Sequence, residues 1–383
     1  MDRILPLPAV PGREPSSVMD RALAWRDRLV ATTAFQQWAA RFPLTRFVAR
    51  RRAAALFDLC AGFVYSQVLK ACVELNVFEL LRQTPLTIEA LAARTAMPFA
   101  ELERLVGAAI SLRLLERRSN DRVGLGALGA PLVGNEALLA LVAHHGLLYD
   151  DLRDPVALLR RRSTMDTALA RYYPYAAEAS APSETAVAPY SALMSATASP
   201  LIAEVLDAYS FAGHQVVMDV GGGEGRFARA LSSRWSHLNV QVFDLPPVAE
   251  RARRASIGME GECRFSAIGG DFRSSPLPLG ADAITLIRVL LDHDDDTVLT
   301  LLSRTRSALG TGGKLLIAEP MAGVKGARMV GDAYFALYLY AMGSGRARSA
   351  AELSQFCRRA GFSRVRSVPT RYPLSTSILV AEV

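Results

Sequence analysis

The sequence predicts a two-part protein, with a mostly parallel, Rossmann-like α/β sheet in the C-terminal half and a helical N-terminal half before it. Two observations predict the sheet: apolar runs alternate with helical patterns, and a glycine-rich turn lies between the first run and its helix. A third observation predicts a winged helix-turn-helix in the N-terminal half: from about residue 75 to residue 133, short helical patterns are followed by a hairpin. We expect one domain over 1–195 and a second over 196–383.

Size and composition favour a folded, two-domain protein. The 383 residues are 51% hydrophobic and 21% charged, which argues against a disordered chain. The most apolar stretch, Ala53–Val73, contains Asp58 and Lys70 and falls short of the ~18 uninterrupted apolar residues of a membrane span. The N-terminus has no signal-peptide core, so a cytoplasmic protein is expected. The four cysteines are scattered and have no histidine pair nearby, so neither a metal site nor a disulfide framework is expected.

The net charge of +7 leaves two interpretations open. Lysine occurs only at positions 70, 314 and 325, so almost all of the positive charge is arginine, with dense clusters at 50–52 and 160–162. Such clusters are either solvated surface or a contact with anionic lipid or a partner.

The N-terminal half is predicted to be helical. An amphipathic pattern indicates one helix over Val18–Arg41, which Pro43 ends. A second, longer helix is expected over Arg50–Leu75; it is apolar on more than one face, which is typical of a buried helix, often one packed against a second subunit. Residues 134–200 read as further helices, with an exposed connection at 176–189.

The winged-helix pattern has a DNA-binding and a structural interpretation. Thr87 and Pro98 each precede a helix start, and 101–115 would be the recognition helix. That segment carries Glu101 and Glu103 and few cations, whereas a helix facing phosphates should be basic. A dimerisation module is therefore the preferred interpretation, and no nucleic-acid partner is expected.

The glycine stretch at 215–244 has the layout of a nucleotide-binding βαβ unit. Asp219 ends an apolar run, glycines follow at 221, 223 and 225, and a second apolar run ends in Asp244. Glycines allow a tight turn close to a ligand, and an acidic residue after the second strand can accept both hydroxyls of a ribose. A dinucleotide-dependent dehydrogenase shares this turn and is the rival interpretation.

Further strands are expected downstream of this unit. The apolar runs predict strands near 215–220, 239–244, 282–288, 313–319, 363–368 and 376–382. The last two follow each other closely and are expected to form an antiparallel pair at one edge of the sheet.

Several short motifs resemble one family. The glycine turn, Asp244-Leu245-Pro246, Gly270-Asp271-Phe272, Arg288 and Glu319-Pro320 come in the order found in class I S-adenosylmethionine-dependent O-methyltransferases of the acetylserotonin and plant phenolic type. The resemblance implies a seven-stranded sheet, a winged-helix dimerisation domain and a homodimer. It also implies S-adenosylmethionine as methyl donor and S-adenosylhomocysteine as product.

The resemblance implies specific roles for the motif residues. Asp244 would bind the ribose diol of S-adenosylmethionine, and Asp219 and Gly221 the amino acid end. Gly223 and Leu245 are further expected cofactor-binding residues. Gly270, Asp271 and Phe272 would bind adenine, with Asp271 accepting from its amine and Phe272 stacking. Arg288 completes the set of cofactor-binding residues.

The catalytic base of the family is absent at its usual place. Related enzymes carry Arg-x-x-His-Asp-Trp, but here Leu291 stands at the histidine position and His293 at the aromatic one. His293 is either a replacement base that orients the hydroxyl or a surface residue before a helix near Asp295. Glu319 resembles a carboxylate that orients the base, or it forms an ion pair with an arginine. General base catalysis contributes about 10²–10⁴ in rate and positioning about 7–11 kcal/mol, so loss of the usual base does not exclude an enzyme.

The acceptor pocket is expected to be lipophilic. The helix over 331–342 places Tyr334, Tyr338 and Met342 at helical spacing, either as core or as pocket wall, and Met194, Phe63, Tyr65 and Tyr172 would add to the wall. The segments at 25–69, 292–296 and 342–349 further resemble the demethylspheroidene (hydroxyneurosporene) O-methyltransferases of carotenoid synthesis. This implies a tertiary 1-hydroxy group of an acyclic carotenoid as acceptor and a place beside a membrane. Enzymes of bacteriochlorophyll or antibiotic pathways, and a catalytically inactive winged-helix regulator, are the alternatives.

Overall fold

The computed structural model describes residues 18–160, 166–173, 184–258, 264–372 and 376–383, and the side chains of 184–189 are not described. Its contacts divide the chain into two compact units, Met1–Ala71 and Cys72–Val383. The expected domain boundary at 195 and 196 stays a prediction; α10 (Glu184–Ala208) is continuous through it.

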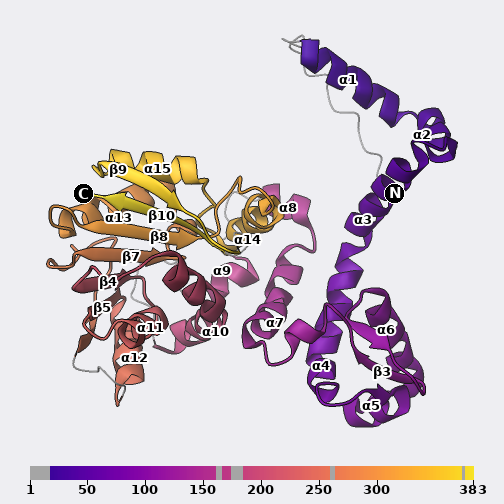
Figure 1. The fold of residues 1–383 in the computed structure, drawn as a ribbon, viewed down its shortest axis with the longest axis horizontal. Helices are drawn as coiled ribbons and strands as arrows, with labels where there is room; N and C mark the ends of the chain where they lie inside the picture. Colours follow the sequence, from indigo (N-terminus) through magenta and orange to yellow (C-terminus); the bar gives the residue numbers. More distant parts are fainter. Residues whose placement is uncertain (1–17, 161–165, 174–183, 259–263, 373–375) are drawn as a thin grey trace. The chain divides into compact units, whose positions relative to one another are not determined.

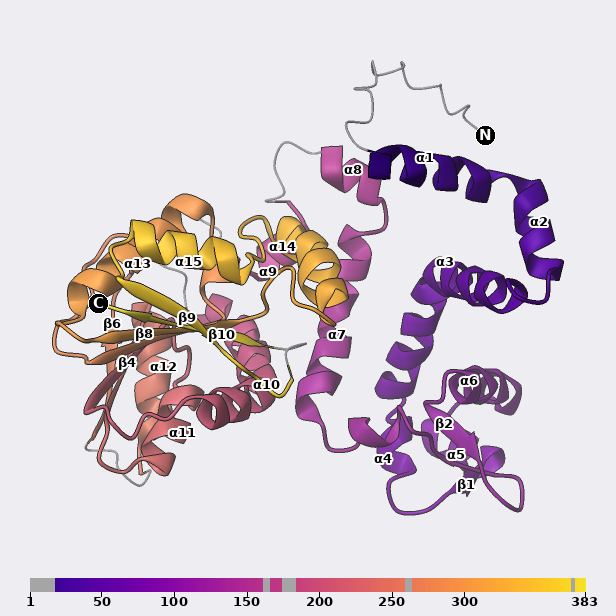
Figure 2. The ribbon, with the colours of Figure 1, turned by 45° about the horizontal axis from the view of Figure 1, so that its top comes forward.

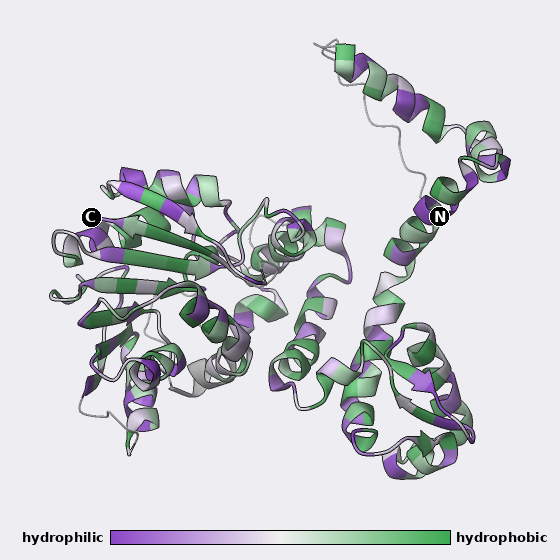
Figure 3. Cartoon of the chain, viewed as in Figure 1, coloured by the Kyte–Doolittle hydropathy of each residue, from purple (hydrophilic) through white to green (hydrophobic). Residues whose placement is uncertain are grey.

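The first unit is made of three helices. They are α1 (Val18–Ala31), α2 (Thr33–Arg41) and α3 (Arg46–Glu74), the last of which continues into the second unit. The expectation of one helix over Val18–Arg41 was wrong, because the extended backbone at Thr32 (ψ 130°) separates α1 from α2. Among residues 18–71 only Ala39 is buried, so α3 is exposed on most faces within this unit. Figure 3 shows hydrophobic and hydrophilic residues side by side along these helices.

By length and composition α3 could cross a membrane, contrary to the expectation from Ala53–Val73. This is weak support for a span, because one such helix is also found in proteins that never enter a bilayer. Asp58 and Lys70 would both lie within the hydrocarbon region.

The second unit begins with the winged helix. Its elements are α4 (Val77–Leu80), β1 (Leu86–Thr87), α5 (Ile88–Thr95), α6 (Phe99–Ser111), β2 (Leu115–Arg117) and β3 (Arg122–Leu125), with strand order β1-β3-β2. The predicted start at Thr87 is confirmed, since its side chain caps α5 by accepting from Ala90 N. On α6, Glu101 and Glu103 are exposed, which disfavours contact with phosphates.

Helices and a seven-stranded sheet make up the rest (Figures 1 and 2). The helical elements are η1 (Ala130–Leu132), α7 (Glu136–Asp151), α8 (Pro155–Arg160), α9 (Ala168–Tyr172), α10, α11 (Arg226–Arg234), α12 (Pro246–Ser256), η3 (Leu290–Asp292), α13 (Asp295–Ala308), η4 (Met329–Tyr334), α14 (Phe335–Met342) and α15 (Ala350–Arg359). The strands are β4 (Val216–Val220), β5 (Asn239–Asp244), β6 (Phe265–Gly269), β7 (Ala283–Ile287), β8 (Lys314–Glu319), β9 (Arg364–Val368) and β10 (Ser377–Glu382). The expected connection at 176–189 lies outside the described residues up to 183, and from 184 onward it is helical, which the sequence did not predict.

The sheet has the order β6-β5-β4-β7-β8-β10-β9. The first five strands are parallel, and β10 runs antiparallel to both β8 and β9. The six predicted strands and the antiparallel pair are confirmed. The sequence analysis missed β6, a short edge strand whose residues are only partly buried and which therefore lacks a strong apolar pattern.

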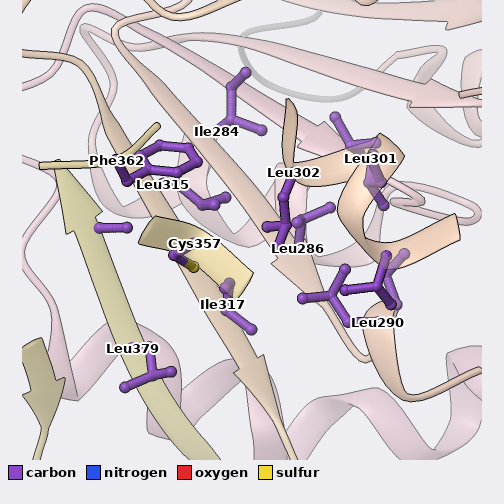
Figure 4. Packing of buried hydrophobic residues seen from close by; sticks show 14 of the residues in the cluster. Ile284, Leu286, Leu290, Leu301, Leu302, Leu315, Ile317, Cys357, Phe362 and Leu379 are labelled. Atoms are coloured by element: carbon purple, nitrogen blue, oxygen red, sulfur yellow. The ribbon is translucent and has the colours of Figure 1, made fainter. Parts of the chain in front are cut away.

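Both faces of the sheet are covered, as the alternation of its strands requires. Met218 and Ile317 point to the side of α13 and α15, whereas Val217 and Leu316 point to the side of α10 and α11. Figure 4 shows side chains of β7, β8 and β10 meeting those of α13 and α15 on the first side. This packing fixes the carboxyl ends of the parallel strands, where a ligand binds in open α/β sheets.

Replacing Ile317 by alanine tests this core. Ile317 is fully buried in β8, so Ile317→Ala should lower the free energy of unfolding by about 2–5 kcal/mol. Urea denaturation measures the change. The control is Leu279→Ala, whose side chain is 77% exposed and which should stay within about 0.5 kcal/mol of wild type. Equal effects of the two changes would contradict the packing.

Candidate active site

A cleft opens where β4, β5 and β7 end. It is lined by residues of the turns after these strands and after β6, and by α10 on its other side. Of the residues predicted from sequence, those that line it are Met194, Asp219, Gly221, Gly223, Asp244, Leu245, Gly270, Asp271, Phe272, Arg288 and His293. Tyr334, Tyr338, Met342 and Glu319 lie outside the lining.

The glycine turn needs its glycines for two physical reasons. Gly221, Gly223 and Gly225 have φ of 70°, 57° and 76°, a region that other residues rarely adopt. A Cβ on Gly221 would also lie 2.7 Å from Cγ2 of Val289. The turn thus brings the backbone against Val289, just after the carboxyl end of β7, and its Gly221 N–H donates to Phe243 O at 2.8 Å.

Asp219 sits beneath this turn. It is paired in register with Thr285 of β7, and its Oδ1 accepts a hydrogen bond from the Thr285 hydroxyl at 2.7 Å. A Cβ on Gly222 would lie 2.6 Å from the Asp219 Oδ2, so the carboxylate leaves no room for a side chain there. Burial raises the pKa of Asp219 to about 7, against the lowering effect of the Thr285 hydrogen bond.

Asp244 closes the adjoining strand and holds the turn. Its Oδ2 accepts from Gly223 N at 2.8 Å, and its Oδ1 accepts from Leu245 N at 2.7 Å. Burial raises its pKa to about 6, although both backbone hydrogen bonds favour the carboxylate. Each oxygen keeps a second lone pair, so the group can still accept the two hydroxyls of a ribose.

The turn after β6 supplies the next wall. Gly270 N donates to Asp244 O at 2.9 Å, and a Cβ on Gly270 would lie 2.5 Å from the Phe243 ring. Asp271 accepts from the backbone and the guanidinium of Arg273. Burial opposes ionisation of Asp271, but these hydrogen bonds and the charge of Arg273 outweigh it and lower the pKa. This geometry leaves Phe272 at the cleft.

Arg288 joins the end of β7 to α10. Its guanidinium donates to Thr197 Oγ1 and to Met194 O, both at 3.0 Å, and its backbone has the unusual φ of 54°. Burial lowers its pKa, partly offset by the charge of Asp292. A non-glycine residue with positive φ costs free energy, and such residues are common at functional sites.

His293 and Glu319 occupy different surroundings. The His293 ring meets Phe272 edge-on, with centroids 5.2 Å apart, and burial lowers its pKa to about 4, so the ring is neutral near pH 7. Glu319 is fully buried at the end of β8, and its Oε2 accepts from Leu291 N at 3.1 Å. Burial raises the Glu319 pKa to about 8. Among the described residues it forms no ion pair, and its Oε1 has no hydrogen-bond partner.

The predicted pocket tyrosines belong to an aromatic cluster behind the cleft. Tyr338 OH and His144 Nε2 are 2.8 Å apart, as are Tyr334 OH and His145 Nε2. Tyr338 and Met342 are buried in this cluster, and Met194 and Tyr334 pack against it. In Figure 2, α14 lies beside α7 and α9. Phe63 and Tyr65 belong to the first unit, where Phe63 is exposed.

The sequence analysis missed Asp292, Tyr190 and the two histidines of α7. Asp292 follows the leucine that replaces the base, and Tyr190 is its hydrogen-bond partner at 3.1 Å. Both line the cleft. The adjacent histidines 144 and 145 in an apolar helix were the signal for partners across the core, since unpaired buried imidazoles are costly.

Fold and site together define a class. The chain matches the family model of the O-methyltransferase domain over residues 149–363 and that of the O-methyltransferase dimerisation domain over residues 57–129. It belongs to the S-adenosylmethionine-dependent O-methyltransferases, and its fold and cofactor are those the motifs predicted.

Two named relatives and one solved structure are similar to this chain over most of its length. The chain is 41% identical over 357 residues to demethylspheroidene O-methyltransferase of Cereibacter sphaeroides, covering 92% of this chain and 93% of that one. It is 32% identical to acetylserotonin O-methyltransferase of Mus musculus, covering 83% and 86%. The crystal structure of human N-acetylserotonin methyltransferase in complex with SAM has the same fold, with a TM-score of 0.71, 24% identity, and 86% and 97% covered.

The cleft fits S-adenosylmethionine on its own chemistry. A Cβ on Gly221 or on Gly222 would collide with Val289 or with Asp219. The carboxylate oxygens of Asp219 and Asp244 can accept hydrogen bonds from an ammonium and a diol. The described residues contain no group of three or more His, Cys, Asp or Glu side chains that could hold a metal ion.

Adding a methyl group to the glycine turn tests this fit. In Gly221→Ala the new Cβ would meet Val289, and the positive φ would be strained by about 1–3 kcal/mol. Calorimetry should show S-adenosylmethionine binding roughly tenfold or more weaker. Gly310→Ala is the matched control, because a Cβ there meets nothing within 4 Å. Unchanged affinity in Gly221→Ala would rule out close approach of the ligand to this turn.

Proposed function

We propose that this enzyme methylates the tertiary 1-hydroxy group of an acyclic carotenoid of the demethylspheroidene or hydroxyneurosporene type. The relative from Cereibacter sphaeroides, at 41% identity over almost the whole chain, supports this acceptor. The aromatic cluster beside the cleft, formed by α7, α9, α10 and α14, supports a lipophilic substrate.

The residues divide by ligand in this proposal. S-adenosylmethionine supplies an electrophilic methyl group on a cationic sulfur. Asp244 and Leu245 hold its ribose, Gly270, Asp271 and Phe272 its adenine, and Asp219, Gly221, Gly223 and Arg288 its amino acid end.

The remaining predicted residues act on the acceptor side or support it. Met194 borders the acceptor at the cleft, and Tyr334, Tyr338 and Met342 form the apolar layer behind it. Glu319 supports the loop at Leu291 through a backbone hydrogen bond. His293 lies against Phe272 and helps to exclude water from the adenine end.

Labelled methyl transfer tests the acceptor. Wild-type enzyme, S-adenosylmethionine labelled in its methyl group, and a detergent-dispersed hydroxylated acyclic carotenoid should give a labelled methyl ether, identified by mass spectrometry. Asp244→Ala should give none, because the ribose loses its acceptors. If the carotenoid stays unlabelled while another compound of a pigment extract is methylated, the proposed acceptor is wrong.

We further propose a homodimer that docks on a membrane surface. The dimerisation model begins at residue 57, so the second copy covers the later part of α3. The part before it exposes large apolar residues, among them Trp25 at 65%, Leu44 at 82% and Phe47 at 71%. Arginines at 21, 26, 28, 41, 46 and 50–52 flank them. Exposed Trp and Leu with arginines are typical of helices that lie in an anionic lipid surface.

Vesicle co-sedimentation tests the docking. The protein should sediment with phosphatidylglycerol vesicles and much less with phosphatidylcholine vesicles. Trp25→Ser combined with Leu44→Ser should reduce the bound fraction several-fold, whereas Ile257→Ser, which changes an exposed residue of the second unit, should not. Equal binding to both lipids would contradict the electrostatic part, and full binding by the double variant would contradict the apolar part.

A further inference from the structure

The place of the usual base holds no titratable group. Leu291 is buried, with 3% of its surface exposed, and packs in the cluster that contains Tyr190 and Tyr338. The proton of the acceptor hydroxyl therefore needs another acceptor among the residues that line the cleft.

Asp292 is an acidic residue in a position to accept this proton. It follows Leu291 at the end of η3 and lines the cleft together with Tyr190, Met194 and Arg288. Its Oδ2 accepts from Tyr190 OH at 3.1 Å. Its Oδ1 has no hydrogen-bond donor among the described residues, so this oxygen is available to a substrate hydroxyl.

Three other carboxylates of the cleft already have hydrogen-bond partners. Asp219 bonds to Thr285 beneath the glycine turn, and Asp244 bonds to two backbone N–H groups. Asp271 is paired with Arg273. The ring of His293 packs against Phe272, which belongs to the turn assigned to adenine.

The loop that carries Asp292 is held at several points. Ser344 Oγ donates to Asp292 O at 2.5 Å, and Glu319 accepts from Leu291 N. The fully buried guanidinium of Arg348 donates to Leu290 O at 2.8 Å and to His293 O at 2.7 Å. A carboxylate fixed in this way is preorganised, which is what a positioned proton acceptor requires.

We propose that Asp292 orients the acceptor hydroxyl and accepts its proton, in place of the missing histidine. The proposal rests on the alcohol acceptor class of the proposed function. The hydroxyl oxygen forms a bond to the methyl carbon as the methyl–sulfur bond breaks, with that electron pair remaining on sulfur as a neutral thioether. The hydroxyl proton passes to Oδ1 of Asp292.

A carboxylate is strong enough for this step because of its timing. A free alcohol is a very weak acid, but its proton becomes strongly acidic as the oxygen forms a third bond, to the methyl carbon, and gains positive charge. The acceptor thus needs to take the proton only during or after methyl transfer, and general base catalysis follows the basicity required at that point.

The charges around Asp292 place its ionisation near neutrality. Burial raises its pKa to about 7, while the Tyr190 hydrogen bond and the Arg288 charge lower it. The other groups that interact with it are Tyr338 of α14 and Glu319 of β8, and His293 is its neighbour in the chain. Only the ionised form accepts a proton, so turnover should rise with pH through about 7 and level off above it.

The test compares Asp292→Asn with His293→Asn on whichever hydroxylated acceptor the wild-type enzyme methylates, so that an error in the carotenoid assignment does not affect it. Asp292→Asn should lower kcat by roughly 10²–10⁴ and abolish the pH dependence near 7, while calorimetry shows unchanged S-adenosylmethionine affinity. His293→Asn should keep the wild-type pH profile.

Two further variants distinguish a role of Asp292 in proton transfer from a purely structural role. Tyr190→Phe removes a hydrogen bond that favours the carboxylate, so the apparent pKa of kcat should move upward. Asp292→Ala should regain part of its activity with added formate, which supplies a carboxylate. Full activity of Asp292→Asn, an unmoved profile in Tyr190→Phe, or absence of formate rescue in a variant that still binds S-adenosylmethionine would each overturn the proposal.

Discussion

The guanidinium of Arg348 is the contact on which the acceptor side of the site depends. It is fully buried, and it donates to the carbonyls of Leu290 and His293 and to the carboxylate of Asp295. One side chain thus joins the segment before α15 to the first residue of η3, to the loop after η3 and to the first residue of α13. A planar group with five donors is suited to such multiple contacts, and lysine could not replace it.

Buried carboxylates gather where the strands end. Burial raises the pKa of Asp219 to about 7, of Asp244 to about 6, of Asp292 to about 7 and of Glu319 to about 8. A carboxyl group whose pKa is raised in the folded protein binds more protons there than in the unfolded chain. The free energy of unfolding therefore falls as pH rises from about 4 toward these raised values. The site keeps this arrangement at the expense of stability, which is typical of functional sites.

The sequence allowed prediction of those elements that depend on a local residue pattern. It did not allow prediction of contacts between residues far apart in the chain, or of elements without such a pattern. The order β4, glycine turn, α11, β5 could be predicted, because each step has its own periodicity or a residue type that the backbone requires. The break between α1 and α2 at Thr32 has no proline or glycine that would predict it, and the edge strand β6 has no alternation of apolar residues. The pairs His144–Tyr338 and Tyr190–Asp292 join residues far apart in sequence. Such pairs are not determined by spacing along the chain.

The lack of burial in α1, α2 and α3 has a consequence for how the enzyme behaves on dilution. Residues 18–71 bury only Ala39, too little apolar surface to offset the conformational entropy of ordering three helices. In the proposed homodimer their order is supplied by the second copy and by the lipid surface. By mass action its extent then depends on protomer concentration and on the amount of that surface. The extent to which the first unit is ordered is thereby coupled to the supply of these partners, a dependence that a self-contained domain would not have.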